Sequence, residues 1–291
     1  MDKIVLSGFA DEISSSLDRQ IQVLKKLGIS HMEIRGVEKK GIDTYATEEV
    51  KEIKGKLDDQ GIAISSLASP IGKINIKDDF TPHLEHFKHV AELAHVLNTR
   101  YIRMFSFYIP EGKDPEDYRE KVIEKLAKFD AIAKAHDIVL IHENEKDIYG
   151  DRKERCRVIL DALGSDHFKA VFDFANFVQC GEDTMECWEL LRDQVVYIHI
   201  KDAVASDKEN VRCGTGEGKI KEILTRAIRE EGYEGFLTLE PHLVLFDALQ
   251  SLEVSDAESV IKENKAKDGA EGYSMQYHAL KEILNSIERQ D

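Results

Sequence analysis

Four side chains that can bind a metal ion stand at the ends of short apolar runs in the second half of the chain. They are Glu143, Asp173, His199 and Glu240, spaced 30, 26 and 41 residues apart. Each apolar run is typical of a buried strand, so four predicted strands end on a carboxylate or an imidazole. Three carboxylates and one imidazole favour Mn²⁺ or Mg²⁺, and the histidine also allows Co²⁺ or Zn²⁺. We therefore predict that these residues converge on one divalent cation, where the chemistry takes place.

A purely structural role is the alternative for each of these residues. A buried acid at the end of a strand can cap a helix or pair with a lysine. For one acid taken alone, this alternative is the stronger interpretation. Metal-binding side chains at four successive strand ends favour the cation site instead.

A cation of this kind predicts a reaction that begins with removal of a proton next to a carbonyl group. Chelation of the carbonyl and of the adjacent hydroxyl stabilises the developing enediolate, and a nearby carboxylate takes the proton. Return of the proton to the opposite face gives epimerisation, and return to the neighbouring carbon gives isomerisation. Loss of a β-hydroxyl gives dehydration. The residues therefore predict the first half of the reaction and leave the product open.

Eight segments of strand-like character alternate with segments of helical periodicity along the chain. The predicted strands are residues 3–7, 29–35, 62–67, 100–106, 139–143, 170–173, 195–199 and 236–240. The predicted helices are residues 17–27, 47–59, 81–97, 115–135, 152–163, 185–191, 220–229 and 273–287. Strict alternation of strands and helices favours a parallel sheet with crossover helices.

Eight such units predict an α/β fold, a single (β/α)8 TIM barrel over residues 1–291. Two domains and an open doubly wound sheet are the alternatives; the open sheet is disfavoured because no GxGxxG motif follows the first predicted strand. The four candidate ligands lie at the carboxyl ends of their strands, where TIM barrels carry their active sites. Residues 243–272 open with an apolar run and then turn polar and acidic, which predicts a lid or a surface excursion.

Side-chain alternation along the four ligand strands agrees with a barrel. The residues two positions before each ligand would also point inward, and all are bulky or β-branched, as a packed interior requires. They are Ile141, Val171, Tyr197 and Thr238. Neighbours of opposite orientation are predicted to face the helix layer. They are Leu140, Phe172, Ile198 and Leu239.

The composition limits the classes of partner. The chain has 291 residues, 42% of them hydrophobic, and a net charge of -16. This charge disfavours nucleic acid, because phosphate binding needs clustered Lys and Arg. The apolar runs are far shorter than the ~20 residues that span a bilayer, and the chain starts directly in a strand, so we expect no membrane contact and no signal peptide. The four cysteines lack CxxC spacing, and we expect free thiols in the cytoplasm.

Four short motifs around the candidate ligands resemble those of a known family. They read His142-Glu143-Asn144-Glu145, Phe172-Asp173-Phe174-Ala175-Asn176, His199-Ile200-Lys201-Asp202 and Leu239-Glu240-Pro241-His242. The set is similar to that of the sugar phosphate isomerase/epimerase superfamily, the xylose isomerase-like TIM barrels also called AP endonuclease family 2. The resemblance covers nearly the whole chain. It implies a barrel with a Glu, Asp, His, Glu metal site, in a family whose members act on ketoses, hydroxypyruvate or inositol derivatives, or cleave abasic DNA.

The resemblance also implies roles for individual residues. The family's epimerases use the two glutamates of the metal site as the acid/base pair, a role that falls here on Glu143 and Glu240. Many members carry a histidine three residues after the aspartate, where this chain has Asn176. An amide can hydrogen-bond a substrate hydroxyl but cannot titrate. A proton shuttle at this position is therefore disfavoured, and so is a repair endonuclease, which would need additional histidine ligands.

Further polar residues near the predicted strand ends are candidates for substrate binding. They are Asn176, Lys201, Arg103 and His242. Lys201 could hold a substrate oxygen or the charge of an enediolate, and a pair with Asp202 is the alternative. Arg103 could bind a carboxylate or a phosphate. Arg35 could do the same, with an ion pair to Glu33 as its alternative.

Taken with the motifs, these residues predict a divalent-metal-dependent isomerase or epimerase that acts on a ketose, a sugar phosphate or a keto-polyol through an enediolate. The alternatives are a lyase of the inosose dehydratase type on the same site, a DNA-repair hydrolase of the AP endonuclease type, and a binding protein without activity. The net charge of -16 disfavours the endonuclease. The intact ligand set disfavours the inactive protein. The expected partner is a small sugar or keto-polyol, without nucleic acid or membrane, and a homo-oligomer is left open.

Overall fold

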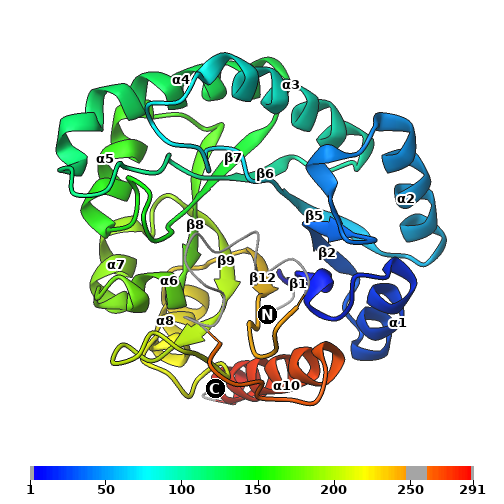
Figure 1. Ribbon diagram of the computed structural model, residues 1–291. Helices are drawn as coiled ribbons and strands as arrows, with labels where there is room; N and C mark the ends of the chain where they lie inside the picture. The colour runs from blue at the N-terminus through cyan, green and yellow to red at the C-terminus, as the bar shows by residue number, and fades with distance from the viewer. Residues whose placement is uncertain (1–2, 247–260, 290–291) are drawn as a thin grey trace.

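A parallel eight-stranded sheet forms a nearly closed barrel at the centre of the computed structural model, which describes residues 3–246 and 261–289 (Figure 1). The strands are β1 (Ile4–Gly8), β2 (His31–Ile34), β5 (Ala63–Ala68), β6 (Tyr101–Met104), β7 (Val139–Glu143), β8 (Phe168–Asp173), β9 (Val195–Ile200) and β12 (Gly235–Leu239). They pair in the order β1-β12-β9-β8-β7-β6-β5-β2, and the end strands β1 and β2 contact each other. The predicted TIM barrel is confirmed, and the open doubly wound sheet is wrong.

Helices surround the barrel on its outer side (Figure 1). They are α1 (Leu17–Leu27), α2 (Thr47–Asp59), α3 (Phe80–Val96), α4 (Arg119–Ala135), α5 (Lys153–Leu163), α6 (Phe174–Gln179), α7 (Thr184–Leu191), α8 (Ile220–Thr225) and α10 (Gly269–Glu288). Single turns η1 (Ala10–Glu12), η2 (Ile42–Thr44), η3 (Pro115–Tyr118) and η4 (Arg226–Glu230) lie beside them. Two short antiparallel pairs occupy loops, β3 (Gly36–Val37) with β4 (Lys40–Gly41) and β10 (Asp202–Ala203) with β11 (Asn210–Val211).

The end of α1 shows how local sequence sets these boundaries. Gly28 follows the last helical residue and has a left-handed backbone with φ of 72°. Only glycine adopts this conformation without a Cβ penalty. The Gly28 amide donates to the Lys25 carbonyl and the Ile29 amide to the Leu24 carbonyl, so the last turn is closed and the chain is redirected into β2.

Three boundaries differ from the sequence predictions. The short helix α6 begins directly after β8, where no helix was expected. The last helix starts at Gly269, earlier than predicted, so the final part of the expected lid at 243–272 belongs to α10. Residues 247–260 of that lid lie outside the described residues. The helix predicted at 220–229 is α8 followed by one π-helical turn.

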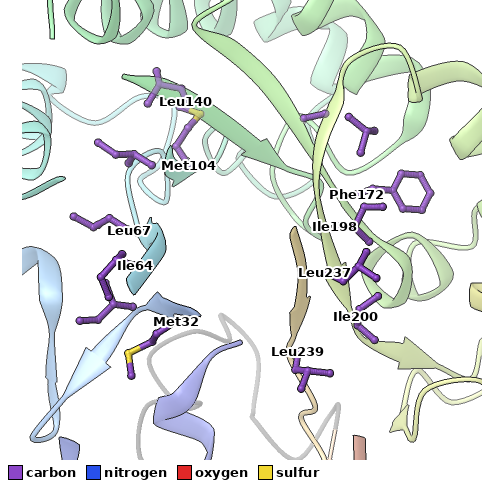
Figure 2. Close-up of a cluster of buried hydrophobic side chains, with 14 of the residues drawn as sticks. Met32, Ile64, Leu67, Met104, Leu140, Phe172, Ile198, Ile200, Leu237 and Leu239 are labelled. Carbon is purple, nitrogen blue, oxygen red and sulfur yellow. The ribbon is translucent and has the colours of Figure 1, made fainter. Parts of the chain in front are cut away.

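Side chains of the strands divide between two apolar layers, as the alternation predicts. The barrel interior holds a cluster formed by Val139, Ile141, Val171 and Tyr197. The opposite sides of the same strands pack into the large core between barrel and helices (Figure 2). The predicted members Leu140, Phe172, Ile198 and Leu239 all lie in this outer core. Burial of each such side chain stabilises the fold by ~1.5–3 kcal/mol, so the outer layer fixes which residues can point inward.

Two further features concern the chain as a whole. In the described ranges, none of the helices combines the length and the apolar character needed to cross a membrane. All four cysteines carry free thiols, as predicted.

Candidate metal centre

The four candidate ligands meet at the carboxyl end of the barrel. Glu143, Asp173, His199 and Glu240 each offer a ligand atom, and these atoms lie within 4.8 Å of one another in a fully buried group. The Nδ1 atom of His199 lies 3.1 Å from Glu143 Oε1 and 3.4 Å from Glu240 Oε2. It lies 3.8 Å from Asp173 Oδ2. The structure thus brings together, around one point, all four residues proposed from the sequence.

Two carboxylate oxygens of this group accept no hydrogen bond from the described residues, although each forms an ion pair with the ammonium of Lys201. They are Asp173 Oδ2 and Glu240 Oε2, and both are buried. A buried polar atom without a hydrogen-bond partner is costly and rare. Because these oxygens face the same point as His199 Nδ1, the residues fit a divalent cation with three oxygen donors and one nitrogen donor.

Lys201 supplies the nearest positive charge. Its Nζ lies 3.2 Å from Asp173 Oδ2 and 3.2 Å from Glu240 Oε2. Burial alone would lower the pKa of Lys201, but the charges of these two carboxylates raise it well above its ordinary value. The sequence alternative of a pair with Asp202 is wrong, because Asp202 accepts hydrogen bonds from backbone amides of the following loop.

Arg103 contacts the group at Glu143. Its Nη1 donates to Glu143 Oε2 at 3.1 Å, and the guanidinium carbon lies 5.2 Å from the Phe9 ring centroid and 4.9 Å from that of Phe105. The Nε atom of Arg103 has no hydrogen-bond partner among the described residues. Arg103 therefore orients Glu143 and keeps one donor free beside it.

Arg35 belongs to the wall of the site between β1, β2 and β12. Its Nε donates to Asp11 Oδ2 at 2.8 Å, and its Nη1 donates to Glu240 Oε1 at 3.0 Å. Its Nη2 lies 3.4 Å from Glu12 Oε1. The sequence alternative of an ion pair between Arg35 and Glu33 is wrong. Arg35 is instead the cation that holds one oxygen of Glu240.

Asn176 is held by the protein through its backbone and its side chain. Its backbone amide donates to Asp173 Oδ1 at 2.7 Å, so that Asp173 caps α6. Its Nδ2 donates to the Asn144 carbonyl at 2.9 Å and to Glu143 Oε1 at 3.4 Å. The amide predicted to touch the substrate therefore also orients a candidate ligand. The capping contact shows that the structural role weighed for Asp173 coexists with its position in the group.

His242 forms a second buried group with Glu12 and Glu240. Its backbone amide donates to Glu12 Oε2 at 2.7 Å, and its Nε2 has no hydrogen-bond partner among the described residues. Burial, and then the charge of Lys201, lower the pKa of His242 well below its ordinary value, so the imidazole is neutral. The guanidinium of Arg35 already contacts both carboxylates of this group, so a cation here would face repulsion.

The charges around the main group are unevenly compensated. Burial would raise the pKa of Glu143, but the positive charges of His199 and Arg103 lower it to about 2. Burial raises the pKa of Asp173 to about 7, because the positive charge of Lys201 offsets only part of the effect of burial. Asp173 is therefore the carboxylate whose charged form would gain most from an added cation.

Sequence reasoning missed several residues of the wall. Asp11 and Glu12 follow β1, and Glu33 reaches His199 Nε2 at 3.1 Å. The first strand, like the later ones, ends near acidic residues. The acidic residues after β1 could therefore have been found from the sequence. The interaction of Glu33 with His199 could not, because 166 residues separate them.

The family described as xylose isomerase-like TIM barrel matches residues 21–265. The chain belongs to this family. Three solved structures share its fold. An L-ribulose 3-epimerase has 16% identity and a TM-score of 0.76, with 99% of this chain and 96% of that chain covered. The IolI protein with a binding zinc atom has 15% identity and a TM-score of 0.76, with 97% of this chain and 99% of that chain covered.

The third structure is the probable 3-DHS dehydratase AsbF from Bacillus anthracis. It has 15% identity and a TM-score of 0.73, with 95% of this chain and 98% of that chain covered. At identities this low, the likeness between this xylose isomerase-like barrel and the three proteins shows a shared fold alone. No curated protein matches the chain in sequence.

Proposed function

We propose that this barrel is a divalent-metal-dependent isomerase or epimerase that moves a proton next to a carbonyl group of a ketose, a sugar phosphate or a keto-polyol. The observation that carries the proposal is the buried group of Glu143, Asp173, His199 and Glu240, whose ligand atoms lie within 4.8 Å of one another. The zinc of the IolI structure and the epimerase among the similar folds support it.

A divalent cation held by these residues would supply Lewis-acid stabilisation of the negative charge that develops on a carbonyl oxygen. Glu143 and Glu240 are the residues proposed to take and return the proton. They extend from β7 and β12, which are three positions apart in the pairing order of the strands. Carboxylates from such separated strands can approach one carbon of a substrate from two sides, as epimerisation requires.

Lys201 and Arg103 flank the proposed proton carriers. Lys201 remains charged beside Asp173 and Glu240, so it can hold a substrate oxygen that becomes negative as the proton leaves. The free Nε donor of Arg103 lies on the Glu143 side. These two cations suit a substrate rich in oxygen atoms, and Asn176 and His242 complete the proposed contacts.

A lyase on the same residues is the second candidate function. The probable dehydratase among the similar folds favours it. The proton would be removed in the same way, and the reaction would then continue by loss of a hydroxyl group from the neighbouring carbon. The first step is therefore shared, and the substrate decides the outcome.

A screen in deuterated water tests both candidates. The protein is incubated with Mn²⁺, Mg²⁺, Co²⁺ or Zn²⁺ and with a panel of ketoses, sugar phosphates and inososes, followed by NMR. We expect metal-dependent uptake of deuterium at the carbon next to the carbonyl. Loss of water from one substrate would identify the lyase. An isomerised or epimerised product without deuterium would contradict return of a proton from solvent, because a hydride shift leaves no solvent label in the product.

A further inference from the structure

Glu33 is a fully buried carboxylate that the proposed reaction does not use. It lies on β2 with 0% of its surface exposed. Its Oε2 lies 3.1 Å from Nε2 of His199, the ring nitrogen that faces away from the candidate metal point. An isolated buried carboxylate is costly unless it is paired, so the interaction with His199 accounts for its position.

Glu33 lies above a layer of buried hydroxyl groups in the barrel interior. The Tyr197 hydroxyl bonds to Ser65 Oγ at 2.8 Å and accepts from Thr238 Oγ1 at 2.8 Å. Ser65 Oγ in turn bonds to Ser7 Oγ at 2.6 Å. The ring of Tyr197 stands edge-on to that of His199, with centroids 5.8 Å apart. The ring of Tyr197 is thus the part of this layer that packs against His199, whereas Ser7 lies two hydrogen bonds away from the Tyr197 hydroxyl.

A local irregularity in the sheet falls at the same place. The register between β2 and β5 shifts between Met32 and Glu33, so that Met32 pairs with Ile64 and Glu33 with Ser66. Such shifts re-aim side chains and are frequent next to functional sites. Here the shift accompanies a glutamate directed into the barrel, whereas Met32 belongs to the outer core.

We propose that Glu33 is a positioning residue that holds the proton of His199 on Nε2 and so leaves the Nδ1 lone pair directed at the metal point. Without a metal ion both nitrogens of His199 lie beside carboxylates. A ligating imidazole is neutral and carries one proton, so a cation at Nδ1 would replace the proton there, and the partner of the other nitrogen would retain its own. The inference rests on the proposed metal site, and it does not depend on which reaction follows.

Two substitutions at Glu33 separate positioning from packing. In Glu33→Gln the side chain keeps its shape, but its amide can either accept from or donate to Nε2, so the choice of nitrogen is lost along with the charge. Glu33→Leu removes the polar partner altogether. The matched control is Ser7→Ala, which removes another fully buried hydrogen-bonding group of the same interior without touching His199.

The measurement is the dissociation constant for Mn²⁺ or Zn²⁺ by competition with a chelator. We expect binding about 10-fold weaker in Glu33→Gln and about 100-fold weaker in Glu33→Leu, the range for lost partners of ligating histidines, and unchanged binding in Ser7→Ala. In Zn²⁺-loaded wild type, ¹⁵N NMR of His199 should show the proton on Nε2. If Glu33→Leu does not fold, the metal affinity of Glu33→Gln alone tests whether Glu33 positions His199.

The outcomes distinguish this inference from the proposed function. Wild-type affinity in Glu33→Gln, or equal weakening in Ser7→Ala, would overturn the role of Glu33 while leaving the metal site in place. A wild-type protein that binds neither Mn²⁺ nor Zn²⁺, or a His199→Ala variant that binds as well as wild type, would overturn the metal site and the inference with it.

Discussion

Asn144 and Asp173 exchange two hydrogen bonds across the ends of neighbouring strands. The Asn144 Nδ2 atom donates to the Asp173 carbonyl at 3.0 Å, and the Asp173 amide donates to Asn144 Oδ1 at 3.0 Å. The side chain of Asn144 thereby continues the ladder between β7 and β8 by one step. Glu143, the residue before Asn144, is paired in register with Val171, so the Asn144 side chain fastens the end of β7 to the end of β8 that carries Asp173.

Replacement of Asn144 by alanine should therefore lower stability and metal affinity together. The change leaves a backbone donor and a backbone acceptor of Asp173 without partners in a buried place, at a cost of ~2–4 kcal/mol in the free energy of unfolding. Denaturant unfolding measures this loss. The exposed Asn285→Ala is the control and should stay within ~0.5 kcal/mol of wild type. An Asn144→Ala protein as stable as wild type would show that the two bonds do not hold the strand ends.

Loss of His199 should abolish the stabilisation of the protein by divalent cations. A cation at 100 times its dissociation constant raises the free energy of unfolding by about 2.7 kcal/mol. We expect a rise in melting temperature on addition of Mn²⁺ in wild type, and almost none in His199→Ala. Comparing each variant with and without metal removes the direct effect of the substitution. Metal content measured by elemental analysis that is equal in both proteins would contradict the assignment of His199 as a ligand.

Asp202 holds the loop that follows β9. Its Oδ2 accepts from the amides of Gly214 at 2.9 Å and Gly216 at 3.0 Å, and its Oδ1 accepts from Gly218 at 3.0 Å. Asp202→Ala should cost ~3–5 kcal/mol of unfolding free energy, because several buried amides lose a charged acceptor. Asp202→Asn retains one acceptor oxygen and should cost less. Gly216→Ala should also destabilise, since a Cβ there would overlap the carboxylate of Asp202.

The control for this loop is Asp207→Asn, at an exposed position beyond β10. It should change the unfolding free energy by less than ~0.5 kcal/mol. Equal stability of Asp202→Ala and Asp207→Asn in urea unfolding would refute a clamping role for the buried carboxylate.

His83 should make stability depend on pH. Its Nε2 accepts a hydrogen bond from the Gly72 amide at 2.8 Å. Burial, and then the charges of His86 and Lys125, lower its pKa from 6.5 to about 4. Between pH 4 and 6.5 the unfolded chain therefore binds a proton at His83 that the folded protein does not. The contribution of His83 to the free energy of unfolding is complete above pH 6.5 and is lost as the pH falls toward 4.

The measurement is the difference in unfolding free energy between pH 7.5 and 4.5. We expect His83→Gln, which retains an acceptor for Gly72, to lose less stability than wild type over this interval, by ~1 kcal/mol. The exposed His278→Gln is the control and should follow the wild-type curve. A His83→Gln protein whose stability depends on pH as that of wild type does would show that His83 does not cause this loss of stability at low pH.

The barrel and its inward-facing residues could be predicted because the signals are local. Apolar runs that end on polar residues mark the strands, and alternation separates Ile141 from Leu140. The helix α6 could not be predicted in this way, because all six of its residues are buried. A helix with no exposed face lacks the polar stripe on which helical periodicity depends.

The partners of charged residues in the site were less predictable than the residues themselves. Arg35 pairs with Glu240, which is 205 residues away in sequence. Glu33 is only two positions from Arg35, yet it faces His199 instead. The closed barrel brings the first and last strands together, and this neighbourhood arises only after the whole chain has folded.

The last prediction concerns the two glutamates proposed to carry the proton. Both lie in the same buried group, but their second oxygens have different partners. Arg103 Nη1 donates to Glu143 Oε2 at 3.1 Å, and Arg35 Nη1 donates to Glu240 Oε1 at 3.0 Å. Each carboxylate is thus oriented by its own arginine. Glu→Gln at either position retains an oxygen ligand and removes the base, so turnover should fall by ~10²–10⁴-fold while some metal remains bound.

The two variants should differ from each other if the reaction is a two-base epimerisation. One glutamate removes the proton on one face of the carbon, and the other delivers it on the opposite face. A variant that retains only one base can still exchange the substrate proton with solvent on its own face, which NMR in deuterated water shows as loss of the proton signal without product. Glu234→Gln, at the exposed position just before β12, is the control and should turn over at the wild-type rate. If Glu143→Gln or Glu240→Gln also turned over at that rate with metal bound, the substituted glutamate would act only as a ligand, and the mechanism with two carboxylates would be wrong.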